Sequence, residues 1–290
     1  MSYAAIHPAW DEVTENLLEG YSLEITAKDV PALREAAPMI APQTPIAVTF
    51  LPGEEMDDRI AAVKVVRDLG FEPMPHISAR RITSEAVLED MIKRVTSESG
   101  VERVFLIAGD PPTPEGPFED SLQVIKTGLL EKYGIKAVGL AGHPEGHPNV
   151  SNDELWVWME NKIAELRQRN ILPIIVTQFG FSAEPFLVWL EQMRARGIDA
   201  PVRIGVPGPA GIKRLLAFAA RCGVGASASV MSKYGVSLTK LMGTAGPDKL
   251  VGALRNGIAP DTHGRVRLHF YPFGGLSKTL EWVTEQHQKS

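Results

Sequence analysis

The sequence feature that most constrains the fold is a regular alternation of short apolar segments with longer amphipathic ones. Eight segments are apolar on both faces, as strands buried between helices are. They cover residues 21–25, 45–50, 71–77, 103–108, 136–141, 173–179, 202–206 and 265–271. Helical patterns lie between consecutive segments, and strand–helix alternation of this kind indicates a parallel sheet.

Three of the helical patterns have recognisable ends. Serine and threonine are favoured at helix N-caps, and glycine is favoured just past the last helical residue. The three patterns run from Asp57 to Gly70, from Thr83 or Ser84 to Gly100, and from Ser182 to Gly197. These ends predict helices that begin and stop between the apolar segments.

Eight strand–helix units over about 250 residues have the size of a (β/α)8 barrel. The expected fold is therefore α/β, a (β/α)8 TIM barrel that forms a single domain over residues 1–290. Extra helices are expected in residues 223–264, before the last strand. A doubly wound sheet is the alternative, because eight strand predictions do not prove that the sheet closes.

Charge and cysteine content exclude several classes of protein. The net charge of the 290 residues is −5, so the chain has no basic surplus for a phosphate backbone and no nucleic-acid partner is expected. Cys222 is the only cysteine, which excludes an intramolecular disulfide and a cysteine-based zinc site. A single cysteine suits a reducing compartment.

The N-terminal residues lack the basic and apolar regions of a secretory signal. No stretch of the chain approaches 18 consecutive apolar residues, so we expect no membrane span. The expected location is the cytoplasm.

Polar residues at strand ends are the candidate site residues, because the active sites of closed βα barrels form at the carboxyl ends of the strands. These residues are Glu24, Thr49, His76, Asp110, His143, His147, Gln178 and Tyr271. A single polar residue at a strand end is more often a turn or cap residue. Several polar residues at the same end of the barrel favour a functional site, provided that the sheet closes.

Three of these residues have a structural alternative. Glu24 interrupts an apolar strand, where burial without a partner is costly, and it could instead pair with an arginine at the sheet edge. Asp110 could be an Asx-type turn residue ahead of Pro111. His76 could be a satisfied core histidine, which is the interpretation that the sequence alone favours.

The segment "HPEGHPN" could ligate a metal through His143, Glu145 and His147, with His76 and Asp110 as further ligands. Two histidines at this spacing face the same way only in a helix, which the prolines oppose, so a metal-dependent hydrolase stays a minority hypothesis. No nucleophile elbow, P-loop or dinucleotide fingerprint is present.

The amide of Gln178 suits recognition of a flat heterocycle. One or two acids with amide and imidazole donors suit proton and hydride transfer on such a ring.

The motifs "YSLEI", "VTF", "PHIS", "AGDPP", "HPEGHP" and "TQFGF" follow one another over residues 20–272. In this order they resemble the methylenetetrahydrofolate reductases. The resemblance implies a (β/α)8 barrel that reduces 5,10-methylenetetrahydrofolate to 5-methyltetrahydrofolate in one-carbon metabolism. The hydride would come from NADH or NADPH, and the usual form of the family holds FAD.

The resemblance also implies roles for individual residues. Glu24 would be the general acid at folate N10, with a pKa raised by the apolar Leu23 and Ile25, and Asp110 would contact the pterin and the flavin. Gln178, Phe179 and Tyr271 would bind the folate. Thr49, His76, Ala108, His143 and His147 would line the cofactor site, and no metal is implied.

Several positions depart from the family pattern. The arginine expected before Gly-Asp is Ala108, a flavin-packing tyrosine is His143, and a "TLNR"-like turn reads "PFGG". The two absent arginines remove charge-assisted bonds to a pyrophosphate, each worth about 1.5–3 kcal/mol. Arg80 and Arg81 could compensate, and Gly180 would open space where the family has phenylalanine.

FAD is therefore doubtful, and we expect direct hydride transfer from a nicotinamide to the folate. The alternative function is a tetrahydrofolate-dependent methyltransferase on a barrel. No motif indicates an oligomeric state or a preference between NADH and NADPH.

Overall fold

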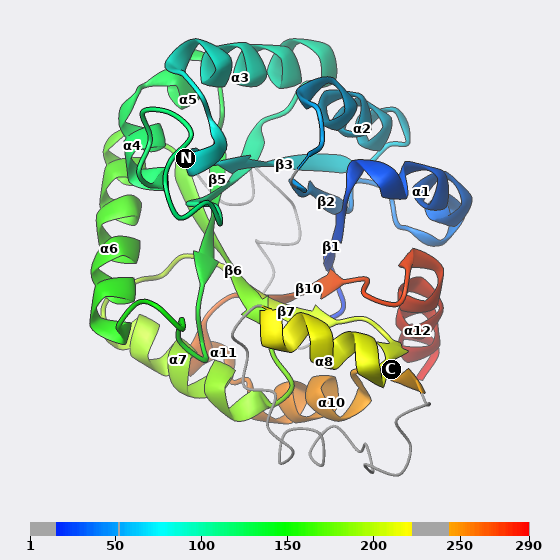
Figure 1. The fold of residues 1–290 in the computed structure, drawn as a ribbon. Helices are drawn as coiled ribbons and strands as arrows, with labels where there is room; N and C mark the ends of the chain where they lie inside the picture. Colours follow the sequence, from blue (N-terminus) through cyan, green and yellow to red (C-terminus); the bar gives the residue numbers. More distant parts are fainter. Residues whose placement is uncertain (1–15, 52, 222–243, 290) are drawn as a thin grey trace.

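The computed structural model describes residues 16–51, 53–221 and 244–289, and its central feature is a closed parallel barrel (Figure 1). The strands pair in the order β1-β10-β7-β6-β5-β4-β3-β2. They are β1 (Ser22–Ile25), β2 (Pro45–Val48), β3 (Glu72–Ser78), β4 (Arg103–Ile107), β5 (Ala137–Gly142), β6 (Leu172–Phe179), β7 (Val202–Pro207) and β10 (Val266–Tyr271). Each lies on one predicted segment. The barrel is confirmed, and the doubly wound alternative is wrong.

Helices surround the barrel, as the ring of coiled ribbons in Figure 1 shows. They are α1 (Val30–Ala36), α2 (Met56–Asp68), α3 (Glu85–Ser99), α4 (Ser121–Lys126), α5 (Leu129–Lys132), α6 (Asn152–Gln168), α7 (Ala183–Ala195), α8 (Ile212–Arg221), α10 (Asp248–Gly257), α11 (Pro260–His263) and α12 (Leu276–Lys289), with 3-10 turns η3 (Ala27–Asp29), η4 (Ala37–Met39) and η5 (Ala79–Arg81). Among the described residues, no helix has the length and apolar character that a membrane span requires.

The predicted helix ends agree with the structure where glycine or serine fixes them. The Ser84 hydroxyl accepts a hydrogen bond from the Val87 amide at 3.2 Å, and Gly100 ends α3 in the left-handed conformation at φ 56°. Helices α10 and α11 confirm the extra helices before the last strand over residues 248–263. The remainder of that prediction, residues 223–243, and Cys222 lie outside the described residues.

One small element was not predicted. Two-residue strands β8 (Ala210–Gly211) and β9 (Thr244–Ala245) pair antiparallel beyond the carboxyl end of β7. Strands of two residues have no periodicity that a sequence pattern can reveal.

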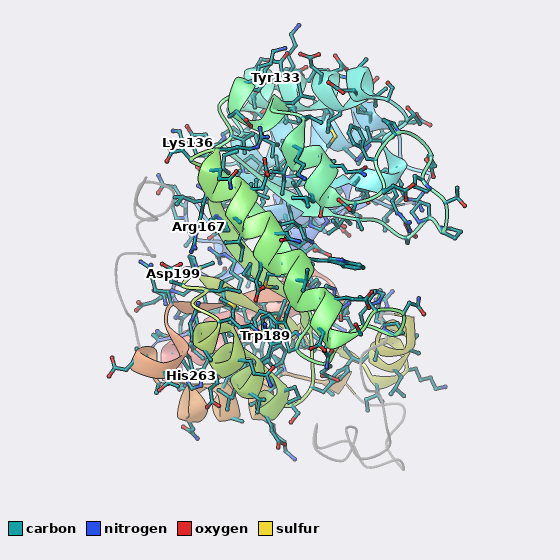
Figure 2. All side chains as sticks on the ribbon, turned by 90° about the vertical axis from the view of Figure 1, so that its left-hand side faces the viewer. Tyr133, Lys136, Arg167, Trp189, Asp199 and His263 are labelled. Atoms are coloured by element: carbon teal, nitrogen blue, oxygen red, sulfur yellow. The ribbon has the colours of Figure 1, made fainter. Side chains whose placement is uncertain are left out.

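Helix α6 is joined to the next strand–helix unit by aromatic and ionic contacts. Trp189 of α7 stacks on Trp156 of α6 with ring centroids 5.4 Å apart, and Arg167 at the end of α6 pairs with Asp199 before β7. Figure 2 looks onto this side of the barrel, with α6 crossing the front. These contacts join neighbouring strand–helix units.

Side chains alternate between the barrel interior and the helix layer along each strand. The interior contains a small apolar cluster of Ala47, Met74, Phe105 and Val176. Gly139 belongs to the same layer, because a Cβ atom there would lie 2.4 Å from the Phe105 ring. The interior is therefore filled, as a barrel of eight strands requires.

The amino-terminal end of the barrel holds three buried arginines, Arg103, Arg203 and Arg267, in the first two residues of their strands. Arg203 donates to the Gly20 carbonyl at 2.8 Å, and Arg103 lies 3.5 Å from Glu72. Burial, reinforced by the other two arginines, lowers the pKa of Arg203 to about 9. The sequence analysis did not identify this cluster, since arginine in a strand gives no signal of burial.

A bulge interrupts the pairing of β6 with β7 between Val176 and Phe179. The Thr177 hydroxyl accepts a hydrogen bond from the Gly205 amide at 2.8 Å. A Cβ atom on Gly205 would lie 2.6 Å from the Thr177 carbonyl oxygen and 2.7 Å from the Gln178 backbone. Only glycine fits against the bulge, and bulges of this kind re-aim nearby side chains.

Replacing Gly205 by alanine is expected to lower the free energy of unfolding by about 1–3 kcal/mol, because the added methyl group meets backbone that cannot move aside. Gly252 in α10 is the matched control, since nothing lies within 4 Å of its added methyl group. Alanine there should stabilise the helix by roughly 0.5–1 kcal/mol. Urea denaturation measures both, and equal stability of the two variants would show that the bulge does not need glycine.

Candidate active site

The predicted site residues lie at one end of the barrel, because all eight strands are parallel. Glu24, His76, Gln178 and Tyr271 belong to the carboxyl-terminal halves of their strands, and Asp110 follows the end of β4. Thr49, Ala108, His143 and His147 follow strand ends on the same side. The arrangement is the one that active sites of βα barrels use.

Glu24 lies between two histidines inside the mouth of the barrel. Its Oε2 atom is 3.5 Å from His76 Nε2 and 3.8 Å from His269 Nε2, and the side chain is 20% exposed. The other ring nitrogen of His269, Nδ1, is 2.8 Å from the hydroxyl of Ser22, two residues before Glu24. Ser22, His269 and Glu24 therefore form a continuous polar group.

The electrostatics of Glu24 differ from the sequence expectation. Burial tends to raise its pKa, but the nearby imidazoles of His269 and His76 outweigh burial, and the pKa is lowered from its usual value. The prediction that Leu23 and Ile25 raise this pKa is wrong. Their side chains point away from Glu24 into the helix-facing core, because residues alternate along β1.

Both histidines are neutral near pH 7. Burial lowers the pKa of His76 to about 4, against the attraction of Glu24, and it also lowers the pKa of His269. A neutral imidazole carries one N–H and one lone pair, so each ring can hold or pass a proton at Glu24.

His76 lies deeper than a surface cofactor contact. Its side chain is 5% exposed, and its ring packs on Phe105 with centroids 4.5 Å apart. The alternative of a satisfied core histidine describes its burial but not its bonding, since neither ring nitrogen has a hydrogen-bond partner among the described residues. Its position beside Glu24 adds a role for it in tuning the acid. His269 was not predicted, and its signal in the sequence was a polar residue in phase with Arg267 and Tyr271 on strand β10.

The Asp110 carboxylate is held by Arg81 of η5, the 3-10 turn that follows β3. Oδ1 accepts hydrogen bonds from Arg81 Nε at 3.0 Å and Nη2 at 2.7 Å, and Arg81 Nη1 binds Glu115 at 3.1 Å. Gly109, at φ +96°, gives Asp110 its position, since a side chain at 109 would crowd the Ser78 hydroxyl. The alternative of an Asx turn alone does not describe this residue.

Arg80 holds the backbone of the same loop. It donates Nη1 to the Pro111 carbonyl at 3.1 Å and Nε to the Glu119 carbonyl at 3.0 Å. Both guanidinium groups are thus engaged within the protein, and compensation by Arg80 and Arg81 for the absent family arginines stays a prediction.

The two histidines of the "HPEGHP" loop stay together, with ring centroids 5.7 Å apart. His147 Nδ1 accepts the Asn149 amide at 3.2 Å. Burial, with positive charge from His147 and Lys162, lowers the pKa of His143 to about 4. Within the described residues no group of three acidic, histidine or cysteine side chains could hold a metal, so the hydrolase hypothesis lacks its ligand set.

The residues predicted to bind the folate, Gln178, Phe179 and Tyr271, lie at or beside the bulge in β6. Gln178 is half-buried within it, and the Tyr271 hydroxyl donates to the neighbouring Thr177 carbonyl at 2.9 Å. Phe179 is 4% exposed and packs on the Tyr271 ring with centroids 5.7 Å apart. Its ring therefore supports Tyr271, and Tyr271 is half-buried at the strand end.

Gly180 does not open space, contrary to the sequence expectation. A Cβ atom there would lie 2.8 Å from the Phe186 ring and 2.9 Å from Glu145 Oε1, so these side chains already fill the position.

The first glycine of the "PFGG" turn, Gly274, has a steric cause. A Cβ atom on Gly274 would lie 1.9 Å from the Pro209 carbonyl oxygen, so the turn packs directly on the β7–β8 connection. No side chain fits at position 274. Position 275, where the "TLNR" pattern has its arginine, is a glycine at φ +103° with nothing within 4 Å of an added Cβ atom, and the exposed position 108 carries only a methyl group.

The sequence is similar to those of several known proteins. A sequence model of the family described as methylenetetrahydrofolate reductase matches residues 28–240. Methylenetetrahydrofolate reductase 2 of Saccharomyces cerevisiae is 30% identical over 51% of this chain and 25% of its own length. The 5,10-methylenetetrahydrofolate reductase of Pectobacterium carotovorum subsp. carotovorum is 27% identical over 60% of this chain and 57% of its own length. The chain thus spans less than two thirds of the length of either relative.

Among solved structures, dihydropteroate synthase from Thermus thermophilus superposes with a TM-score of 0.49 at 14% identity, covering 94% of this chain and 96% of that one. This likeness is too low to bear on function. The family match extends over well more than half of the chain and includes the loop that carries Asp110 and the strand that carries Gln178. The protein therefore belongs to the methylenetetrahydrofolate reductase family.

Proposed function

We propose that the protein reduces 5,10-methylenetetrahydrofolate to 5-methyltetrahydrofolate with a hydride from NADH or NADPH, or catalyses the reverse oxidation. The observation that carries the proposal is Glu24, an acid held between two neutral histidines at the mouth of the barrel. A carboxyl group in this place is costly to bury, and the two imidazoles that lie 3.5 Å and 3.8 Å from it are neutral near pH 7, which is typical of the surroundings of a functional acid.

In the proposed mechanism, protonated Glu24 donates its proton to folate N10. The C–N10 bond of the five-membered ring then breaks, and the carbon becomes the 5-iminium cation. Asp110 stabilises this cation by its negative charge. Hydride addition to the carbon gives the methyl group, and Gln178 holds the heterocycle through its amide.

The next proton reaches Glu24 from solvent, because its side chain is 20% exposed whereas Ser22 and His269 behind it are buried. His269 lies between Glu24 and Ser22, at 3.8 Å and 2.8 Å, and keeps the surroundings of the carboxylate polar. Resupply matters because the pKa of Glu24 is lowered, which leaves the carboxylate ionised near pH 7.

The residues present do not fit FAD. Positions 108 and 275, where the family pattern has arginines, carry an alanine and a glycine, and Arg80 and Arg81 already bind carbonyl and carboxylate oxygens of the protein. None of these four positions therefore offers an uncommitted positive charge to a pyrophosphate. We therefore propose that the nicotinamide delivers its hydride directly to the folate.

The purified protein should oxidise NADH or NADPH on addition of 5,10-methylenetetrahydrofolate without added FAD. Absorbance of the reduced nicotinamide is the readout, and the visible spectrum before and after denaturation is the control. Flavin released on denaturation would contradict the direct transfer. No nicotinamide consumption, with or without FAD, would favour the tetrahydrofolate-dependent methyltransferase.

Glu24→Gln should lower kcat by about two to four orders of magnitude, because the amide cannot donate a proton as an acid does. Binding of 5-methyltetrahydrofolate, measured by calorimetry, should change little. Glu184→Gln is the matched control at an exposed position of α7 and should keep full activity. Retained turnover in the Glu24 variant would remove the acid role.

The pH dependence of kcat/KM tests the histidine contact. Because the pKa of Glu24 is lowered, its protonated fraction is small near pH 7, and kcat/KM for the reduction should rise as the pH falls. His269→Gln removes a group that lowers this pKa and leaves burial, which raises it. In this variant, the pH below which kcat/KM stops rising should therefore be higher than in the wild type, whatever the absolute rate. An unchanged pH profile of kcat/KM would show that His269 does not tune the pKa of Glu24.

A further inference from the structure

Arg81 places a positive charge at the carboxyl-terminal end of the barrel, where the proposed mechanism also forms a positively charged folate intermediate. Neither the family resemblance nor the proposed mechanism gives this residue a role. We propose that Arg81 is a positioning residue: its guanidinium fixes the direction of the Asp110 carboxylate toward the bound folate. The inference rests on the proposed function, because it concerns the acid assigned to the folate cation.

Asp110 needs such support because its side chain is 65% exposed and follows the end of a strand. Arg81 approaches from η5, at the end of β3, and directs both Nε and Nη2 to the same oxygen, Oδ1, at 3.0 Å and 2.7 Å. Two donors of one planar group fix the position of Oδ1 in the plane of the guanidinium, which a single ammonium donor does not.

Arg81 is itself fixed on three sides. Its side chain is 17% exposed, Nη1 binds Glu115 at 3.1 Å, and the guanidinium carbon lies 5.2 Å from the Phe50 ring centre. Ion pairs with one exposed partner contribute little to stability. Orientation is therefore the property that this arrangement determines, more than stability.

The charges are compatible with this role. Arg81, Asp110 and Glu115 together carry one net negative charge, so the guanidinium orders the acid without reversing the sign of the cluster. A negative cluster at the mouth still favours the iminium cation.

The loop backbone does not depend on Arg81. Arg80 binds the Pro111 and Glu119 carbonyls, and the Glu115 amide donates to the Arg80 carbonyl at 2.7 Å. Gly116 packs on residues 82–83, where a Cβ atom would lie 2.2 Å from the Ile82 carbonyl oxygen. A change at Arg81 therefore releases the Asp110 side chain while the loop keeps its path.

The experiment compares Arg81→Gln and Arg81→Lys with wild type. Arg81→Gln should lower kcat/KM for 5,10-methylenetetrahydrofolate by about ten- to a hundredfold, the cost of a small misplacement, while KM for the nicotinamide stays unchanged. Arg81→Lys restores the positive charge but not the two coplanar N–H donors, so it should recover only part of the lost kcat/KM. Arg94→Gln, which breaks ion pairs to Asp57 and Glu98 on the outer helices, is the matched control and should change neither constant.

A double-mutant cycle separates positioning from a general structural effect. Calorimetric binding of 5-methyltetrahydrofolate is measured for wild type, Arg81→Gln, Asp110→Asn and the double variant. If Arg81 acts through Asp110, the double variant binds no more weakly than Asp110→Asn alone. Additive losses, or a Lys variant equal to wild type, would overturn the proposal. If the wild type binds the folate but never oxidises the nicotinamide, the proposed reaction is contradicted. The double-mutant cycle would still decide the role of Arg81, because it measures binding alone.

Discussion

The pairing of the first strand with the last closes the barrel, and the site depends on this closure. Strand β1 pairs with β10 through Ser22 opposite His269 and Leu23 opposite Phe270. Residues 247 positions apart in the chain become neighbours, and the hydroxyl and imidazole come within 2.8 Å. The same register places His269 beside Glu24. Backbone hydrogen bonding thus assembles an acid–histidine group that no local segment contains.

The two ends of the barrel use charge differently. At the amino-terminal end, three buried arginines lie among the strand starts, a position that contributes to stability in folds of this kind. At the carboxyl-terminal end, the histidines are neutral and Arg81 is balanced by Asp110 and Glu115. The mouth therefore presents carboxylates and amides, which suits a flat ring that becomes a cation during the reaction.

The sequence predicted the strands, the closed barrel and most helix ends, because hydrophobic periodicity and glycine positions report burial and backbone conformation directly. It also placed Glu24, Asp110 and Gln178 at strand ends. It did not predict His269, nor the use of Arg81 on Asp110, because both depend on contacts between strands that are distant in the chain. The bulge at Gln178 and the contact of Gly274 with Pro209 are likewise products of packing that sequence spacing does not encode.

The most direct test of the central claim is a crystal structure of the protein with 5-methyltetrahydrofolate and an oxidised nicotinamide dinucleotide. The account predicts the pterin over the mouth of the barrel, with N10 within about 2.6–3.2 Å of the Glu24 carboxylate or one water away from it. The pterin edge should contact Asp110 and Gln178, with the nicotinamide ring against the methyl carbon. A folate bound away from Glu24, or a flavin between the two ligands, would contradict it.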